Sequence, residues 1–315
     1  MRLSTPAVLD RHRNAVIPAI GGALFIAFGA IFIRLSHVAP AAAAFYRCLY
    51  ALPVLAMLAW QERRSRGERP LGAHLFALAA GLLFGIDLVL WCESIVYVGA
   101  GLATVLSNVQ VVIFPLAAWL LISERPSLRL GVAVPIALSG VFLISGEVGG
   151  GAYGRNPGLG AVYGIASGLA YTASLLCMKL AGESEARHTR ARLFELTISS
   201  TLATGAIGLA LGQLRTVPSL SAQFWLVLLA LGSQVAGWLL ITWALPRIAA
   251  GETAVVLTLQ PAGSVLLAML ILGEKPSPLQ LIGVCAIAIA IPLLAVRSAS
   301  RLPALTEGAG AGRTR

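Results

Sequence analysis

Ten long apolar segments, separated by short charged or Gly/Pro-rich breaks, are the feature that most constrains this chain of 315 residues. About 20 apolar residues are enough to cross the ~30 Å hydrocarbon core of a bilayer as an α-helix. Charged residues make up only 11% of the sequence, whereas a soluble domain normally carries about 25%. The sequence therefore predicts an all-α membrane protein with ten transmembrane helices. The expected spans are residues 15–34, 40–60, 72–95, 99–122, 129–146, 157–178, 192–212, 222–245, 251–272 and 279–296.

The distribution of Lys and Arg between the loops predicts the orientation of the chain. With a cytoplasmic N-terminus, all but five of the 23 Lys and Arg residues lie in cytoplasmic loops or tails. The five exceptions are Arg34, Arg155, Arg215 and Lys275, which then face outward, and Arg47, which lies within a span. Cytoplasmic loops carry the excess of positive charge in membrane proteins. We therefore expect a multi-pass protein of the cytoplasmic membrane, with a tail at residues 1–14 and a disordered tail at 297–315 both in the cytoplasm.

The remaining composition narrows the class of protein further. The net charge of +10 does not indicate a partner nucleic acid, because the basic residues lie between apolar runs. The four cysteines also fall inside apolar runs without CxxC spacing, so we interpret them as small hydrophobic residues. The first apolar run continues from Ala15 to Ile33, which is too long for the core of a signal peptide. It is therefore expected to be the first transmembrane helix.

An internal repeat relates the two halves of the sequence. A shift of 150 residues aligns residues 101–127 with 251–277 without a gap, and nine of the 27 positions are identical. The informative matches are Gln110 with Gln260, and the Glu-x-Pro-Ser turns that begin at Glu124 and Glu274.

Because each half has five expected helices, an odd number, the second copy must enter the membrane from the opposite side. Inverted repeats of this kind are typical of secondary transporters. We expect two inverted five-helix repeats, residues 15–146 and 157–296, joined by an external linker at 147–156.

The residues around the repeated segment resemble those of a known family. Tyr97, Gly99 and Gly101 lead into the fourth span, followed by Ser-Glu-Arg-Pro-Ser and a glycine-containing fifth span; a second copy runs from Gly251 to Gly-Glu-Lys-Pro-Ser. This pattern is similar to the EamA domain of the drug/metabolite transporter superfamily, over about residues 15–296. The resemblance implies a transporter with a central cavity, lined mainly by the first, third, fourth, sixth, eighth and ninth spans. The tenth span departs from the pattern, because it aligns only after an insertion and Pro292 interrupts it.

Charged residues inside spans are the sharpest candidates for function, because each costs at least ~2.5 kcal/mol at mid-bilayer and rarely faces lipid. Arg47 and Asp87 both lie roughly 10–12 Å below the outer ends of their spans, at 1.5 Å per residue. The favoured interpretation is a structural salt bridge between them. The alternatives are a substrate contact by Arg47 or protonation of Asp87 during transport.

Further candidates for the cavity are polar or aromatic side chains within spans. Asp87 and Trp91 are four residues apart, hence on one helical face, and Gln234 and Trp238 repeat that spacing. Amides beside a proline can line a cavity where the backbone is irregular, while hydrogen bonding between helices is the competing interpretation. The candidates of this kind, near Pro115, Pro261 or the glycines of the sixth span, are Ser107, Asn108, Gln110, Gln260 and Tyr171.

Other residues are given structural roles. Gly81 and Gly85 lie roughly opposite Asp87 and are expected to allow close packing against a neighbouring helix. Glu195 is expected to pair with Lys179 or Arg192 near the inner end of its span. Glu124 and Glu274, each ahead of Pro-Ser, are expected to cap or brace the next helix start.

Nothing in the sequence indicates catalysis, a cofactor or a metal site. HExxH, P-loop and GxSxG motifs do not occur, and the four histidines are scattered at helix ends or in tails. We therefore expect a secondary transporter, not an enzyme, that moves a small metabolite or drug by alternating access. The expected partners are this small-molecule substrate and the lipid bilayer, and a homodimer stays open. The rival interpretations are a lipid-facing flippase and, less favoured, a membrane-embedded enzyme.

Overall fold

The computed structural model describes residues 6–67, 69–122, 130–146, 148, 151–180, 188–214, 217–244 and 250–295. All regular secondary structure in these ranges is helical. The elements are α1 (Pro6–Ser36), α2 (Pro40–Arg66), α3 (Leu71–Val98), α4 (Ala100–Ser107), α5 (Gln110–Ile122), α6 (Leu130–Ile144), α7 (Pro157–Leu180), α8 (Thr189–Ala210), α9 (Leu220–Leu228), the π-helix η2 (Leu229–Gly237), α10 (Trp238–Ala244), α11 (Ala250–Ile271) and α12 (Pro278–Ala295). Glu124 and the expected tail at 297–315 lie outside the described residues.

The chain is a multi-pass membrane protein. Within the described residues, seven segments are long and apolar enough to cross a membrane, judged by length and composition. They are Ile17–Ser36, Pro40–Arg66, Leu71–Val98, Ala100–Leu121, Pro157–Leu180, Thr189–Ala210 and Leu220–Ile241. Three shorter apolar helices, Gly131–Ile144, Leu259–Ile271 and Pro278–Ala290, overlap the remaining expected spans.

Some helices extend beyond their expected apolar ends. The first helix already begins at Pro6, within the expected N-terminal tail, and α2 continues to Arg66. Polar and charged residues can continue a helix beyond the hydrocarbon region, because helix propensity does not require apolar side chains. Hydrophobicity therefore predicted the membrane-crossing part and missed the polar extensions.

The fourth expected span is broken at Asn108. The side chains of Ser107 and Asn108 both donate to the carbonyl oxygen of Thr104, at 3.2 and 2.7 Å, and such bonds compete with the regular helical ladder. The sequence predicted irregular backbone near Pro115 and Pro261. The break lies nearer to Asn108, and α11 continues without interruption through Pro261.

The eighth expected span is also irregular, which the sequence did not predict. It consists of α9, the π-helix η2 and α10. A Cβ atom at Gly237, the last residue of η2, would lie only 2.7 Å from Cγ1 of Ile26 in α1. Close approach to α1 therefore depends on glycine here, and π-helical turns often occur at functional sites.

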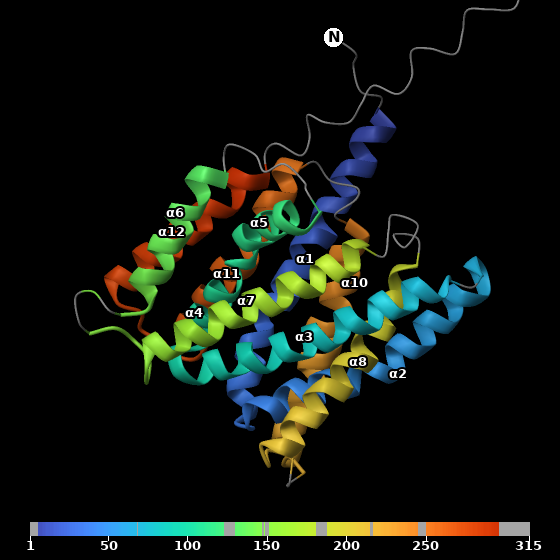
Figure 1. The fold of residues 1–315 in the computed structure, drawn as a ribbon, viewed down its shortest axis with the longest axis horizontal. Helices are drawn as coiled ribbons and strands as arrows, with labels where there is room; N and C mark the ends of the chain where they lie inside the picture. Colours follow the sequence, from blue (N-terminus) through green and yellow to red (C-terminus); the bar gives the residue numbers. More distant parts are fainter. Residues whose placement is uncertain are drawn as a thin grey trace, which may run out of the picture.

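Helix α3 lies beside α7 and α8 in the bundle (Figure 1). A Cβ atom at Gly81 would collide with the carbonyl oxygen of Leu196 in α8, and one at Gly85 would lie 2.8 Å from the Cβ of Ala203. The prediction that Gly81 and Gly85 allow close helix packing is confirmed, and the neighbour is α8.

Helices α4 and α6 of the first half pack against α11 and α12 of the second half. Helices α6 and α12 lie side by side (Figure 1) and cross where a Cβ at Gly140 would lie 2.7 Å from the carbonyl oxygen of Gly283. Helices α4 and α11 also pack together: Gly101 lies against Val265, while Thr104 accepts a hydrogen bond from Ser264 at 3.1 Å. Residue numbers rise along α4 as they fall along α11, so these two helices run antiparallel.

Candidate functional site

A cavity of about 380 Å³ lies in the middle of the bundle, lined by residues of both halves. Its walls come from α1, α2, α3, α4, α5, α7, α10 and α11. The helices that the family resemblance implied all contribute, and α2 adds Arg47. The predicted candidates that line this cavity are Arg47, Asp87, Trp91, Ser107, Asn108, Gln110, Tyr171, Trp238 and Gln260.

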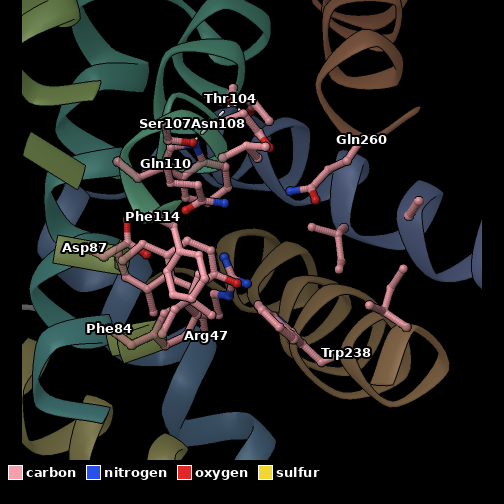
Figure 2. A pocket seen from close by; sticks show the side chains of 18 residues that line it. Arg47, Phe84, Asp87, Thr104, Ser107, Asn108, Gln110, Phe114, Trp238 and Gln260 are labelled. Carbon is pink, nitrogen blue, oxygen red and sulfur yellow. Dashed lines mark hydrogen bonds between the residues drawn. The ribbon is translucent and has the colours of Figure 1, made fainter. Parts of the chain in front are cut away.

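Arg47 is the basic group of the cavity and is held by the irregular segment of the eighth span. Its Nε donates to Oε1 of Gln234 at 2.9 Å, and its Nη2 donates to Oγ of Ser233 at 3.4 Å. The guanidinium carbon lies 5.6 Å from the centre of the Trp91 ring, within the range of a cation–π contact. Only 4% of Arg47 is exposed. These contacts fix the guanidinium at the cavity wall (Figure 2).

Asp87 is the acidic group of the cavity and has a partner of its own. Its Oδ1 accepts a hydrogen bond from Oγ of Ser167 in α7 at 2.5 Å, and 7% of the residue is exposed. No ion pair joins Asp87 to Arg47 in the described part of the chain, so the favoured salt bridge is not formed in this structure. The structure instead places one base and one acid separately on the wall of one cavity (Figure 2).

Aromatic rings form a continuous apolar part of the wall. Phe84, Tyr171 and Trp238, from α3, α7 and α10, contact one another with ring centroids 5.7 to 6.2 Å apart. Trp91 lies nearby, and its buried indole Nε1 has no hydrogen-bond partner in the described structure. That N–H group is therefore an unsatisfied buried donor.

The amide side chains divide into two groups. Asn108 uses its side-chain nitrogen on the backbone of Thr104 and so stabilises the break between α4 and α5. Gln110 and Gln260 lie on facing walls of the cavity, and Gln260 points toward Arg47 (Figure 2).

Gln234 is the one predicted candidate that does not line the cavity. It is fully buried behind Arg47, which donates to its Oε1, and its Nε2 donates to Oγ1 of Thr197 at 3.4 Å. Its spacing to Trp238 suggested the cavity wall because a regular helix was assumed. Arg47 lines the cavity and is bonded to Gln234, so its side chain takes the place at the wall that the spacing had suggested for Gln234.

Glu274 holds the start of a helix in the other half of the chain. Its carboxylate accepts the N–H groups of Ala100 at 2.6 Å and Gly101 at 3.2 Å, and only 2% of the residue is exposed. Burial raises the pKa of Glu274, while the two N–H donors and the charge of Arg34 oppose that rise. The prediction that Glu274 braces the next helix was wrong, because the fold brings the N-terminus of α4 to this loop and its unpaired N–H groups attract a carboxylate.

Glu195 also has different partners from those expected. It binds Nη1 of Arg69 and Nδ1 of His74, each at 2.7 Å. The predicted pairing with Lys179 or Arg192 was wrong. Arg69 lies just before α3 and His74 lies in its first turn. Their pairing with Glu195 of α8 therefore depends on how α3 packs against α8.

Comparison with known proteins identifies the family. The model of the EamA-like transporter family matches residues 13–146 and again residues 158–296. The chain belongs to the EamA-like transporter family. An uncharacterized transporter of Synechocystis sp. is 28% identical over 259 residues, which is 79% of this chain and 77% of that protein. A crystal structure with 17% identity has a similar fold, with a TM-score of 0.61 over 93% of this chain and 99% of the other.

This EamA-like protein is therefore a membrane transporter, and several of its cavity contacts could not be found from sequence patterns. Ser167 and Ser233 support Asp87 and Arg47, but a serine in an apolar span has no spacing signal that marks such a role. Phe84 and Phe114 line the cavity but look like ordinary apolar residues in the sequence. A signal was available for Phe84, because it lies three residues from Asp87 on the same helical face.

Proposed function

We propose that this transporter is a secondary transporter with ten transmembrane helices, which moves a small metabolite or drug across the cytoplasmic membrane by alternating access. The observation that carries the proposal is the cavity between the halves, which holds Arg47 and Asp87 as separate ionisable groups. Buried ionisable groups in a membrane are expensive and typically mark substrate or ion pathways. No P-loop is available in the sequence for ATP hydrolysis, so an ion or substrate gradient would supply the energy.

The pattern of helix contacts supports two repeats related by a two-fold axis. If the five spans of the two halves correspond in order, α1 matches α7, α2 matches α8, α3 matches the segment from α9 to α10 that contains η2, α4 and α5 together match α11, and α6 matches α12. Each contact between halves should then have an exchanged counterpart. Three pairs of contacts follow this rule. The contact of α3 with α7 corresponds to that of α1 with η2, and the contact of α3 with α8 corresponds to that of α2 with η2. The contact of α5 with α7 corresponds to that of α1 with α11. The pairs α2 with α8, α4 with α11 and α6 with α12 are their own counterparts. With antiparallel α4 and α11, this pattern fits an axis in the membrane plane.

Alternating access requires the two repeats to take different conformations. The break between α4 and α5, where α11 is continuous, supports such a difference. The cavity extends from the middle of the bundle to Phe114, Leu175 and Ile241, toward the ends that the charge distribution places in the cytoplasm. At the opposite end, Glu274 holds the N-terminus of α4. We infer a state closed on the outside, with the substrate path directed inward.

The lining of the cavity favours a small solute that carries polar or charged groups on an apolar body. Arg47 can bind an anionic or acceptor group, and Trp91 beside it belongs to the same wall. Asp87 can bind a cationic or donor group, and the rings of Phe84, Tyr171 and Trp238 can cover an apolar part. Asp87 is also the group in this cavity that could carry a coupling proton.

Uptake into proteoliposomes tests this proposal. Labelled metabolites are supplied with and without a pH gradient, and each result is compared with liposomes that contain no protein. Saturable, protein-dependent movement of a soluble solute is expected. Translocation of labelled phospholipid without any soluble solute would favour the rival flippase.

Cysteine labelling tests the topology. A cysteine at Ser65, past the apolar part of α2, should be labelled only from the cytoplasmic side, and one at Tyr153, in the segment before α7, only from outside. Labelling of both from one face would overturn the inverted repeat and the location of both termini in the cytoplasm.

A further inference from the structure

Arg47 keeps hydrogen-bond donors in reserve after its contacts in the central cavity are counted. A guanidinium group carries five N–H donors. Gln234 accepts the Nε donor at 2.9 Å, and Ser233 accepts one donor of Nη2 at 3.4 Å. The other donor of Nη2 and both donors of Nη1 have no partner in the part of the chain that the structure describes.

These remaining donors are open to the cavity. Nη1 of Arg47 is not one of the shielded side-chain nitrogens that lack a partner, so part of its surface is accessible. Arg47 lines the cavity, and its side chain lies between those of Asp87 and Gln260 (Figure 2). Gln234 and Ser233 occupy the Nε side of the guanidinium, which leaves the edge formed by Nη1 and Nη2.

The positive charge at this edge has no acid bound to it. Both hydrogen-bond partners of Arg47 are neutral, and Asp87 is the only acid among the described lining residues. Asp87 acts on Arg47 from a distance, because its Oδ1 accepts from Ser167 and no ion pair joins it to Arg47 within the described residues. A buried cation is costly unless it is paired and hydrogen-bonded. An anionic group that reaches the edge would therefore be stabilised there.

The shape and charge of the edge select a carboxylate. Nη1 and Nη2 present two parallel N–H donors in one plane, and these match the two oxygens of a carboxylate. A phosphate dianion would carry more charge than Arg47, the single cation among the described lining residues, can compensate. The rings of Phe84, Tyr171 and Trp238 supply an apolar wall in the same cavity.

We propose that the transported solute carries a carboxylate on an apolar, ring-bearing body, and that Nη1 and Nη2 of Arg47 bind this carboxylate. Gln234 is a positioning residue, because it holds the guanidinium from behind and is itself bonded to Thr197. The proposal rests on the proposed function, since it names the class of solute for the same cavity.

Isothermal titration calorimetry of the full chain in neutral detergent at neutral pH tests the proposal. The probes are phenylacetate, its uncharged amide phenylacetamide, the cation phenethylamine and benzylphosphonate, each corrected for binding to empty micelles. The wild type should bind phenylacetate at least about tenfold more tightly than phenylacetamide, which has the same shape without the charge. Phenethylamine and benzylphosphonate should both bind more weakly than phenylacetate.

Gln234→Glu tests the role of the guanidinium without a change of side-chain size. The new carboxylate would pair with Arg47 from the Nε side and compensate its charge. Affinity for phenylacetate should fall at least about tenfold, while affinity for phenylacetamide should stay within about twofold. A purely structural role would lower both affinities together. The matched control is Gln223→Glu, which adds the same charge in α9 away from the cavity lining and should bind as the wild type does.

If Gln234→Glu does not fold, Arg47→Lys takes its place. It keeps the charge but removes the planar pair of donors, so the preference for phenylacetate over phenylacetamide should fall at least about fivefold. An unchanged preference in the variant that folds would overturn the proposal.

The wild type alone can also reject the proposal. Absence of phenylacetate binding, or equal binding of phenylacetate and phenylacetamide, would overturn it. Tighter binding of phenethylamine would assign recognition to Asp87, and tighter binding of benzylphosphonate would assign it to a phosphate group; both results reject the carboxylate. Saturable uptake of a different labelled solute into proteoliposomes would still support secondary transport in each of these cases, so the two failures are distinguishable.

Discussion

Helix α3 meets its surroundings in two different ways on its two faces. One face carries Gly81 and Gly85 and packs directly on the backbone of α8. The other carries Asp87 and Trp91 and forms part of the cavity wall. The difference shows how a membrane protein can keep polar groups beside a cavity: close backbone packing on one side fixes the helix, so its other side can border the cavity.

The same contrast extends beyond α3. At the packed end of the bundle, Glu274 satisfies the N–H groups of Ala100 and Gly101. In the cavity, the indole N–H of Trp91 stays without a partner. Substitutions at packed positions should therefore reduce the amount of folded protein, while substitutions in the cavity should reduce transport.

The largest effect is expected for Gly81→Leu. The new side chain would collide with the backbone of Leu196, and backbone cannot move aside as a flexible side chain can. Little or no monodisperse protein should be recovered by size-exclusion chromatography. The control is Gly72→Leu in the same helix, where a Cβ meets nothing within 4 Å. Normal recovery of Gly81→Leu would show that the glycine face is not closely packed.

Glu274→Ala should have the next largest effect, because it leaves two buried N–H groups without an acceptor. Hydrogen bonds to charged groups contribute about 1.5–3 kcal/mol each, so the loss of two should reduce stability by about 3–6 kcal/mol, measured by thermal unfolding in detergent. Lys275→Ala, at the exposed neighbouring residue, is the control and should change little. A variant as stable as the wild type would mean that water replaces the carboxylate.

Asp87→Asn should leave the fold unchanged and lose transport. Asparagine can still accept the hydrogen bond from Ser167, and Arg47 keeps Gln234 and Ser233 as partners. Transport should fall at least about tenfold, which corresponds to about 1.4 kcal/mol. The control is Glu93→Gln, which removes an acid from the same helix away from the cavity lining.

The outcome for Asp87→Asn also separates its two functional roles. If Asp87 carries a proton, gradient-driven transport is lost while downhill exchange of substrate continues. If it contacts the substrate, both are lost. Reduced folding that the double variant Asp87→Asn with Arg47→Gln restores would instead show a structural pair, and normal folding with normal transport would remove Asp87 from the site.

The smallest effect concerns the pH dependence of stability. Burial raises the pKa of Glu274 above its usual 4.5, so the folded state binds this proton more tightly than the unfolded state. The stability that this pKa difference contributes is therefore complete below about pH 4.5 and is lost as pH rises through the raised pKa, while the hydrogen bonds from Ala100 and Gly101 remain. The wild type should lose more stability than Glu274→Gln between pH 4.5 and neutral pH, as measured by thermal unfolding. Parallel curves would exclude a raised pKa.

The sequence by itself determined the helices and most of the candidate residues. A bilayer admits few structures besides apolar helices, so each apolar run predicted a helical segment. Buried charge in such a run is costly enough to single out Arg47 and Asp87, and the glycine spacing of Gly81 and Gly85 directly indicated close packing.

Only the tertiary structure decided which groups meet. Hydrophobicity does not distinguish one neighbouring helix from another, so the pairing of Asp87 with Ser167 and of Arg47 with Gln234 could not be derived from spacing. The same holds for Glu274, which stabilises a helix 174 residues away in sequence. Gln234 is likewise buried behind Arg47 and does not line the cavity, because the fold brings α2 against the eighth span.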